Sequence, residues 1–82
     1  MIEDELRAET KKWLEKIEQK LPNVNVNSKE KGNQFLKNIH AYVSDSKHFL
    51  EKGDLVRAFE AVIWAWSWLE IGLEMGELKS SE

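Results

Sequence analysis

Apolar residues recur at intervals of three and four along most of the 82-residue chain, the spacing that places side chains on one side of an α-helix. The first such stripe predicts a helix over residues 2–21. Pro22 should end it, because proline disfavours helical angles in the residue before it. Val24 and Val26 then alternate with asparagines, which favours a short extended segment lying across the helices.

A second stripe lies between Phe35 and Leu50 and predicts a helix over residues 28–52, with Ser28 as its N-cap. Gly53 suits the left-handed conformation in which many helices end, and Asp54 can cap the helix that follows. The sequence therefore predicts a tight turn between two antiparallel helices.

A third helix is predicted over residues 55–75, and it is apolar on two sides. One side carries the residues expected to face the core: Leu55, Ala58, Phe59, Val62, Ala65, Trp66, Leu69 and Leu73. The other side carries four residues at i, i+4, i+7 and i+11: Trp64, Trp68, Ile71 and Met75. Gly76 can end this helix, and residues 77–82 are expected to form a frayed tail.

Composition supports an all-α fold, since the chain has one proline and four glycines and is rich in helix-forming residues. So short a chain can build one core only. We therefore predict a single domain over residues 1–82, folded as an antiparallel, up-down-up bundle of three helices.

The net charge and the residue composition also limit which partners and which cellular compartment we expect. The net charge of -3 gives no general attraction to nucleic acid or anionic lipid, and we expect neither as a partner. No stretch approaches the roughly 20 apolar residues that span a bilayer, and the acidic N-terminus is expected to be the native start rather than a signal peptide. The absence of cysteine fits a reducing compartment, so we expect a cytoplasmic protein.

The chemistry-bearing residues do not form a recognisable catalytic, cofactor or metal site. His40 and His48 would lie about 12 Å apart along one helix, too far to share a metal ion. No histidine follows Arg57 at the spacing that helical nucleases of this size use. We expect no cofactor, and the sequence gives no positive evidence for catalysis.

The second apolar side of the third helix is the strongest functional signal in the sequence. Exposed together, its four side chains would form a patch of several hundred Å², as large as the largest patch on a typical monomer. The simplest cover is a second copy of the chain, related by a two-fold axis. The alternative is that the first helix or the segment 24–26 packs over it.

Residues 41–76 carry a local signature. It consists of Ala41-Tyr42, then residues 45–54 with Phe49-Leu50 and Gly53-Asp54 at the turn, then Ala58-Phe59, Ala65, Trp68-Leu69-Glu70 and Gly72 in the third helix. This signature resembles that of the archaeal domain-of-unknown-function family 357. The resemblance implies a three-helix, spectrin-repeat-like bundle from an archaeal cytoplasm, with no established activity or ligand.

Three functions remain open at this point. The first is a small, non-catalytic interaction module that forms a homodimer through Trp64, Trp68, Ile71 and Met75. The second is a small-ligand-binding or nucleotide-processing helical domain. The third is a structural partner in a larger complex.

Overall fold

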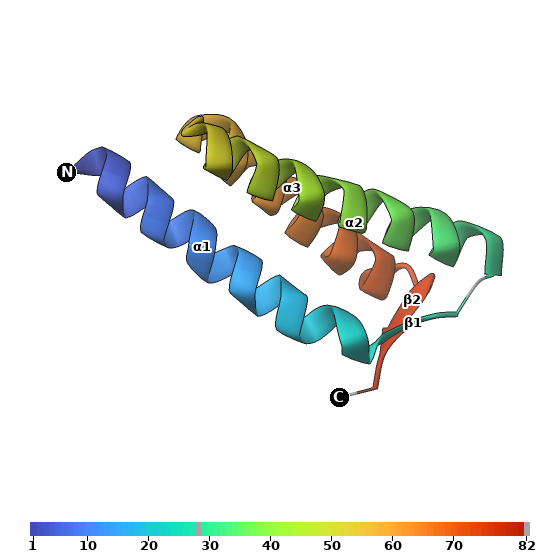
Figure 1. The fold of residues 1–82 in the computed structure, drawn as a ribbon. Coiled ribbons are helices and arrows are strands. Elements are labelled where there is room, and N and C mark those ends of the chain that lie inside the picture. Colours follow the sequence, from blue (N-terminus) through green and yellow to red (C-terminus); the bar gives the residue numbers. More distant parts are fainter. Residues whose placement is uncertain (28, 82) are drawn as a thin grey trace.

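The computed structural model describes residues 1–27 and 29–81, which form three helices and a two-stranded sheet (Figure 1). In chain order the elements are α1 (Ile2–Lys20), the 3-10 turn η1 (Leu21–Asn23), β1 (Val24–Val26), α2 (Lys29–Lys52), α3 (Leu55–Glu74) and β2 (Leu78–Ser80). The predicted all-α bundle is confirmed, as is the extended segment at residues 24–26. The predicted N-cap Ser28 lies outside the described residues.

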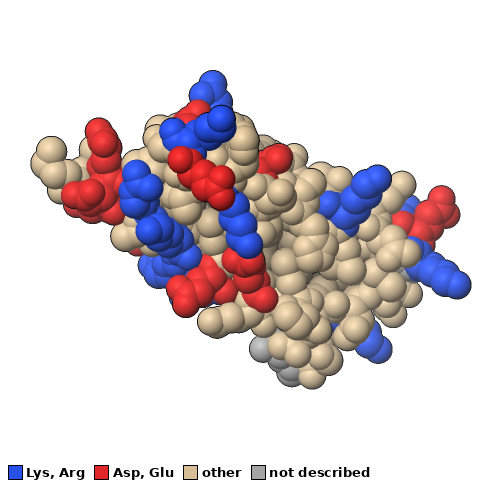
Figure 2. Space-filling model, in the orientation of Figure 1, with Lys and Arg blue, Asp and Glu red and all other residues tan. Residues whose placement is uncertain are grey.

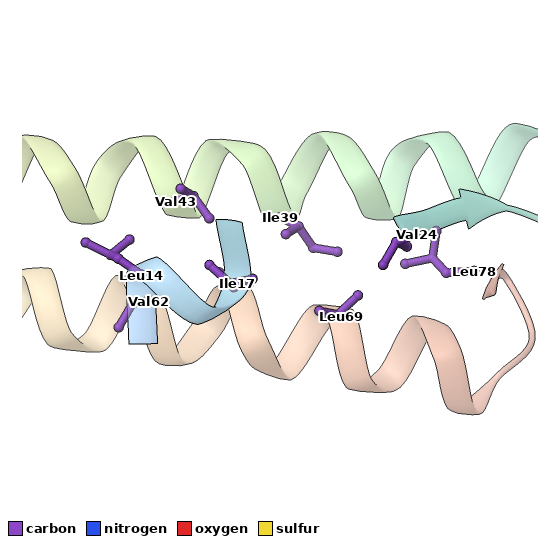
Figure 3. Packing of buried hydrophobic residues seen from close by; sticks show 9 residues of the cluster. Leu14, Ile17, Val24, Ile39, Val43, Val62, Leu69 and Leu78 are labelled. Atoms are coloured by element: carbon purple, nitrogen blue, oxygen red, sulfur yellow. The ribbon is translucent and has the colours of Figure 1, made fainter. Parts of the chain in front are cut away.

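The helix α3 is the central element, because it packs along α2 and also against α1, whereas α1 and α2 contact each other only slightly. Its side toward the core is built largely from small residues: Ala58, Ala61, Ala65 and Gly72 are all buried. Larger side chains from all elements fill the space beside this line (Figure 3). They include Leu14, Ile17, Ile39, Val43, Val62 and Leu69.

Two hydroxyl groups lie in this core, and each has a partner. The Ser46 hydroxyl donates a hydrogen bond of 2.7 Å to the backbone carbonyl of Ala58, which ties α2 to the start of α3. The Thr10 hydroxyl donates to the carbonyl of Leu6 at 2.8 Å within α1. Both residues are fully buried, so an unpaired hydroxyl here would have carried a desolvation penalty.

The turn between α2 and α3 is built as the sequence predicts. Gly53 has a φ of 78°, in the left-handed region that favours glycine. Asp54 caps α3: one carboxylate oxygen accepts from the Arg57 backbone N–H at 3.3 Å, and the other accepts from the Arg57 guanidinium at 2.8 Å.

The expectation of a frayed tail over residues 77–82 is wrong for the described residues 77–81. Residues 78–80 form β2, which pairs antiparallel with β1 and places Val24 opposite Ser80 and Val26 opposite Leu78. Leu78 is 1% exposed. The tail is ordered because it pairs with the backbone hydrogen-bonding groups of β1 and adds an apolar side chain to the core. The sequence did not predict this, because a strand of three residues is too short to show a periodic pattern.

Further hydrogen bonds extend the pairing beyond the strands, and we call β1, β2 and their flanking bonds the strand clasp. The Asn27 N–H donates to the carbonyl of Glu77 at 2.9 Å, and the Ser81 N–H donates to that of Asn23 at 2.8 Å. The Asn27 side chain also donates to the carbonyl of Gly76 at 2.8 Å. The clasp therefore joins the segment after α1 to the segment after α3.

Two glycines allow the clasp to lie against the helices. A Cβ on Gly32 of α2 would lie 2.7 Å from the Glu77 carbonyl oxygen, and one on Gly72 of α3 would lie 2.6 Å from Leu78 Cδ1. Both distances are shorter than any comfortable contact. The absence of a side chain at these two positions is what lets the C-terminal segment pack there.

Leu78→Ala tests whether the clasp contributes to stability. We expect the variant to lose about 2–4 kcal/mol of unfolding free energy, because the truncation leaves a cavity at a fully buried site. Urea denaturation followed by circular dichroism measures the loss. Lys79→Ala, at the exposed middle position of β2, should unfold like the wild type; a tail that contributes nothing would leave both variants unchanged.

Asp54 gives a pH-dependent prediction. The hydrogen bond from the Arg57 side chain holds the pKa of Asp54 below its ordinary value of 3.8. Asp54 is therefore harder to protonate in the folded state than in the unfolded chain. Its ionised carboxylate stabilises the fold at pH values above the ordinary pKa, and this contribution is lost as the pH falls through the lowered pKa of the folded state.

The pH profile of the urea midpoint, measured from about pH 6 to about pH 2, should therefore fall less steeply in Asp54→Asn than in the wild type. The asparagine oxygen can still cap α3, so most of the stability at neutral pH should remain. Arg57→Gln removes the main cause of the shift and should flatten the profile in the same direction. Wild-type profiles in both variants would contradict the assignment.

Candidate interaction face

The structure brings the four predicted interface residues to one side of α3, which we call the aromatic face: Trp64, Trp68, Ile71 and Met75. Trp64 is 56% exposed, Ile71 46% and Met75 60%. Trp68 is half-buried and packs against the core cluster. Three of the four residues therefore present large apolar surfaces to solvent.

The helix α2 supplies the ring contacts along one edge of this face. The Trp64 ring stacks on that of Tyr42, with centroids 6.2 Å apart and planes at 21°. The Trp68 ring packs edge to face on Phe35, at 5.1 Å and 77°. Phe35 and Tyr42 lie seven residues apart on α2 and are themselves half-buried. These contacts come from α2, not from the first helix or segment 24–26 that the sequence suggested as covers.

The opposite flank of α3 carries Trp66, which the sequence placed in the core. Trp66 is half-buried and lies at the contact between α3 and α1. Its ring meets that of Trp13 edge to face, with centroids 5.7 Å apart and planes at 83°. Its indole N–H donates to the backbone carbonyl of Trp13 at 3.0 Å. Phe59 and Leu73 are likewise half-buried, whereas the small Ala61, absent from the predicted core, is buried.

The exposed area of the aromatic face can be judged from its side chains. A large side chain presents about 150–250 Å², so three that are half exposed offer roughly 300 Å² of apolar surface. This is within the range of the largest patch on a typical monomer, about 300–600 Å². The face is therefore large enough to mark an interaction site but does not by its area demand a partner.

A second candidate site is a cleft of about 540 Å³ between α1 and α2. It is lined by Glu18, Leu21, Pro22, His40, Val43, Ser44 and Lys47. Lys47 forms an ion pair with Glu18 across the two helices. The sequence did not indicate this cleft, because its lining comes from α1, η1 and α2 and no stripe or motif marks the residues as neighbours.

Charged side chains are unevenly distributed on the face that Figure 2 shows. They are most crowded on the half of the molecule that holds the N-terminus and the turn between α2 and α3, whereas fewer lie on the half around the strand clasp (Figure 2). Within residues 1–27 and 29–81, no three His, Cys, Asp or Glu side chains come together in a way that could hold a metal ion. Over the same residues, no helix is long and apolar enough to cross a membrane.

The structure has a close counterpart among solved proteins. It superposes with a TM-score of 0.90 on the crystal structure of protein AF1782 from Archaeoglobus fulgidus, a member of DUF357. The two sequences are 56% identical, and the similarity covers 99% of this chain and 100% of the other. No curated protein matches the chain. The model of the family "Protein of unknown function (DUF357)" matches residues 8–78, and the chain belongs to that family.

Proposed function

We propose that the chain is a non-catalytic interaction module that self-associates through the aromatic face of α3. The observation that supports this is the exposure of Trp64, Ile71 and Met75, at 46–60%, along one line of the helix that is otherwise the most buried. Tryptophan and methionine are enriched at protein interfaces, where the indole ring and the polarisable thioether bury large apolar areas.

A second copy of the chain fits this face because the face is uncharged along its length. The positions of this line from Trp64 to Met75 carry no charge. In an antiparallel pair of α3 helices related by a two-fold axis, the apolar side chains of one copy would therefore face the apolar side chains of the other. Glu60 lies one turn before Trp64 and Arg57 about two turns before it, so both charges lie beyond the end of this line. Arg57 is also already held by Asp54. No like charges then face each other at the centre of the contact.

The area sets the strength of the association. A stable interface buries about 800 Å² on each partner, well above the roughly 300 Å² of the three exposed side chains. The flank of α2 beside Tyr42 must therefore join the contact. We propose a weak, concentration-dependent dimer rather than an obligate one.

Trp64→Glu should abolish the dimer, because it places a charge within the apolar contact without touching the buried line of α3. Sedimentation equilibrium from about 10 μM to about 1 mM protein measures the effect over the range expected of a weak interface. The wild type should gain mass with concentration, and the variant should stay monomeric with an unchanged far-ultraviolet spectrum.

Ile63→Glu is the matched control for Trp64→Glu. Ile63 precedes Trp64, is 40% exposed and lies away from the aromatic face. This variant should associate like the wild type. A wild type that is monomeric throughout, or equal losses in both variants, would refute self-association through this face.

The cleft between α1 and α2 supports the second candidate function, a small-ligand-binding domain. Its volume suits a small molecule, and His40, Ser44 and Lys47 offer polar groups along α2. We place it second because the charge of Lys47 is already paired with Glu18 and the lining holds no second cation to attract a phosphate.

The proposal includes the cellular location of the protein and the class of its partner. An archaeal cytoplasm is supported by the 56% identity to an Archaeoglobus fulgidus protein and by the absence of cysteine. The net charge of -3 supports a protein partner rather than nucleic acid or an anionic membrane.

A further inference from the structure

The flank of α3 opposite the aromatic face forms a separate hollow against α1. It has a volume of about 270 Å³ and is lined by Trp13, Ile63, Trp66, Ser67 and Glu70. The planes of the two indole rings meet at 83°, so they form two walls nearly at right angles. Glu70, one turn beyond Trp66, adds an exposed carboxylate to the rim.

This combination of groups has a defined electrostatic character. The face of an indole ring is the negative end of its quadrupole and attracts cations within about 6 Å, tryptophan more strongly than the other aromatic residues. A carboxylate beside such a ring strengthens the attraction. The lining residues contribute one negative charge and no positive charge. The ammonium groups of Lys12 and Lys16 lie against the Trp13 ring, so a cation that enters the hollow must take the place of a cation the chain already supplies.

Two lysine side chains of the chain itself already lie against the Trp13 ring. The ammonium nitrogens of Lys12 and Lys16 lie 5.2 and 4.8 Å from its centroid. The ring is also fixed in place: its indole N–H donates to Glu9 at 3.0 Å, and Trp66 donates to its backbone carbonyl. A rigid ring loses little freedom when a ligand binds against it.

We propose that this hollow binds a small organic cation of the alkylammonium class, held in the corner that the touching Trp13 and Trp66 rings form, with Glu70 as its counter-ion. Quaternary ammonium groups are the ligands that aromatic walls of this kind suit best, because they are cationic, weakly hydrated and apolar at their surface. The site lies on the flank of α3 away from the aromatic face, so it does not depend on self-association.

Choline and its uncharged isostere 3,3-dimethylbutan-1-ol are the probes, added at constant ionic strength to the full chain labelled with ¹⁵N. The chain has four tryptophans, whose indole N–H resonances report separately on the two flanks of α3. Choline should shift the resonances of Trp13 and Trp66 saturably, with a dissociation constant on the order of 10 mM or weaker, because exposed cation-π contacts and ion pairs are each weak. The resonances of Trp64 and Trp68 should stay in place, and the isostere should shift none of the four.

Three variants separate the proposed contacts from a general effect on the fold. Trp13→Leu keeps the backbone carbonyl that Trp66 requires but removes one wall, and should abolish the shifts of Trp66. Glu70→Gln should weaken choline binding about two- to fivefold, the usual range for an exposed charge pair. Glu74→Gln, one turn further along α3 and outside the hollow, should leave it unchanged.

The proposal is overturned if choline and the isostere give equal shifts, or if Trp13→Leu binds choline as the wild type does while retaining its circular dichroism spectrum. Equal weakening by Glu70→Gln and Glu74→Gln would also overturn it, because the attraction would then come from the general negative charge of the chain.

Discussion

The close contact between α2 and α3 determines where every large side chain of α3 can go. Ala58, Ala61, Ala65 and Gly72 are buried along the line of contact, and Ala58 and Ala65 have no exposed surface at all. Small residues let the two backbones approach, which leaves no room for an indole ring between them. The tryptophans of α3 are therefore displaced to its two flanks. This accounts for a helix that is apolar on more than one side without being buried all round.

The same arrangement explains why α1 needs contacts beyond helix packing to hold its position. Since α1 packs against α3 and hardly against α2, its position is fixed by Leu14 and Ile17 in the core and by the Trp13 to Trp66 contact. The strand clasp adds a link at its C-terminal end by joining the segments that follow α1 and α3. The small sheet thus closes the bundle where helix packing alone leaves α1 weakly held.

The sequence predicted the elements whose signals are local. The three helices follow from spacings of three and four, and the turn follows from Gly53 and Asp54, whose conformation and hydrogen bonds do not depend on the rest of the fold. Leu78 was missed because its burial depends on pairing with β1, more than fifty residues earlier, and on the missing side chains of Gly32 and Gly72. The spacing of Trp64, Trp68, Ile71 and Met75 predicted that they share one side of α3. Their contacts with Tyr42 and Phe35 could not be predicted, because the small residues between α2 and α3 determine which side chains of the two helices meet.

The two flanks of α3 differ in chemistry although both are rich in tryptophan. The flank with Trp64 has an uncharged line of apolar side chains beside α2, and such a surface gains most from meeting another of its kind, since neither side must desolvate a charge. The flank with Trp66 has two fixed rings at right angles and a carboxylate, and there an apolar partner would leave Glu70 without water or a counter-ion. A cation satisfies that group and uses the ring faces as well. Under the two proposals, one helix presents two separate recognition surfaces, because its contact with α2 is built largely from alanine and glycine, which leaves the large aromatic side chains on its flanks.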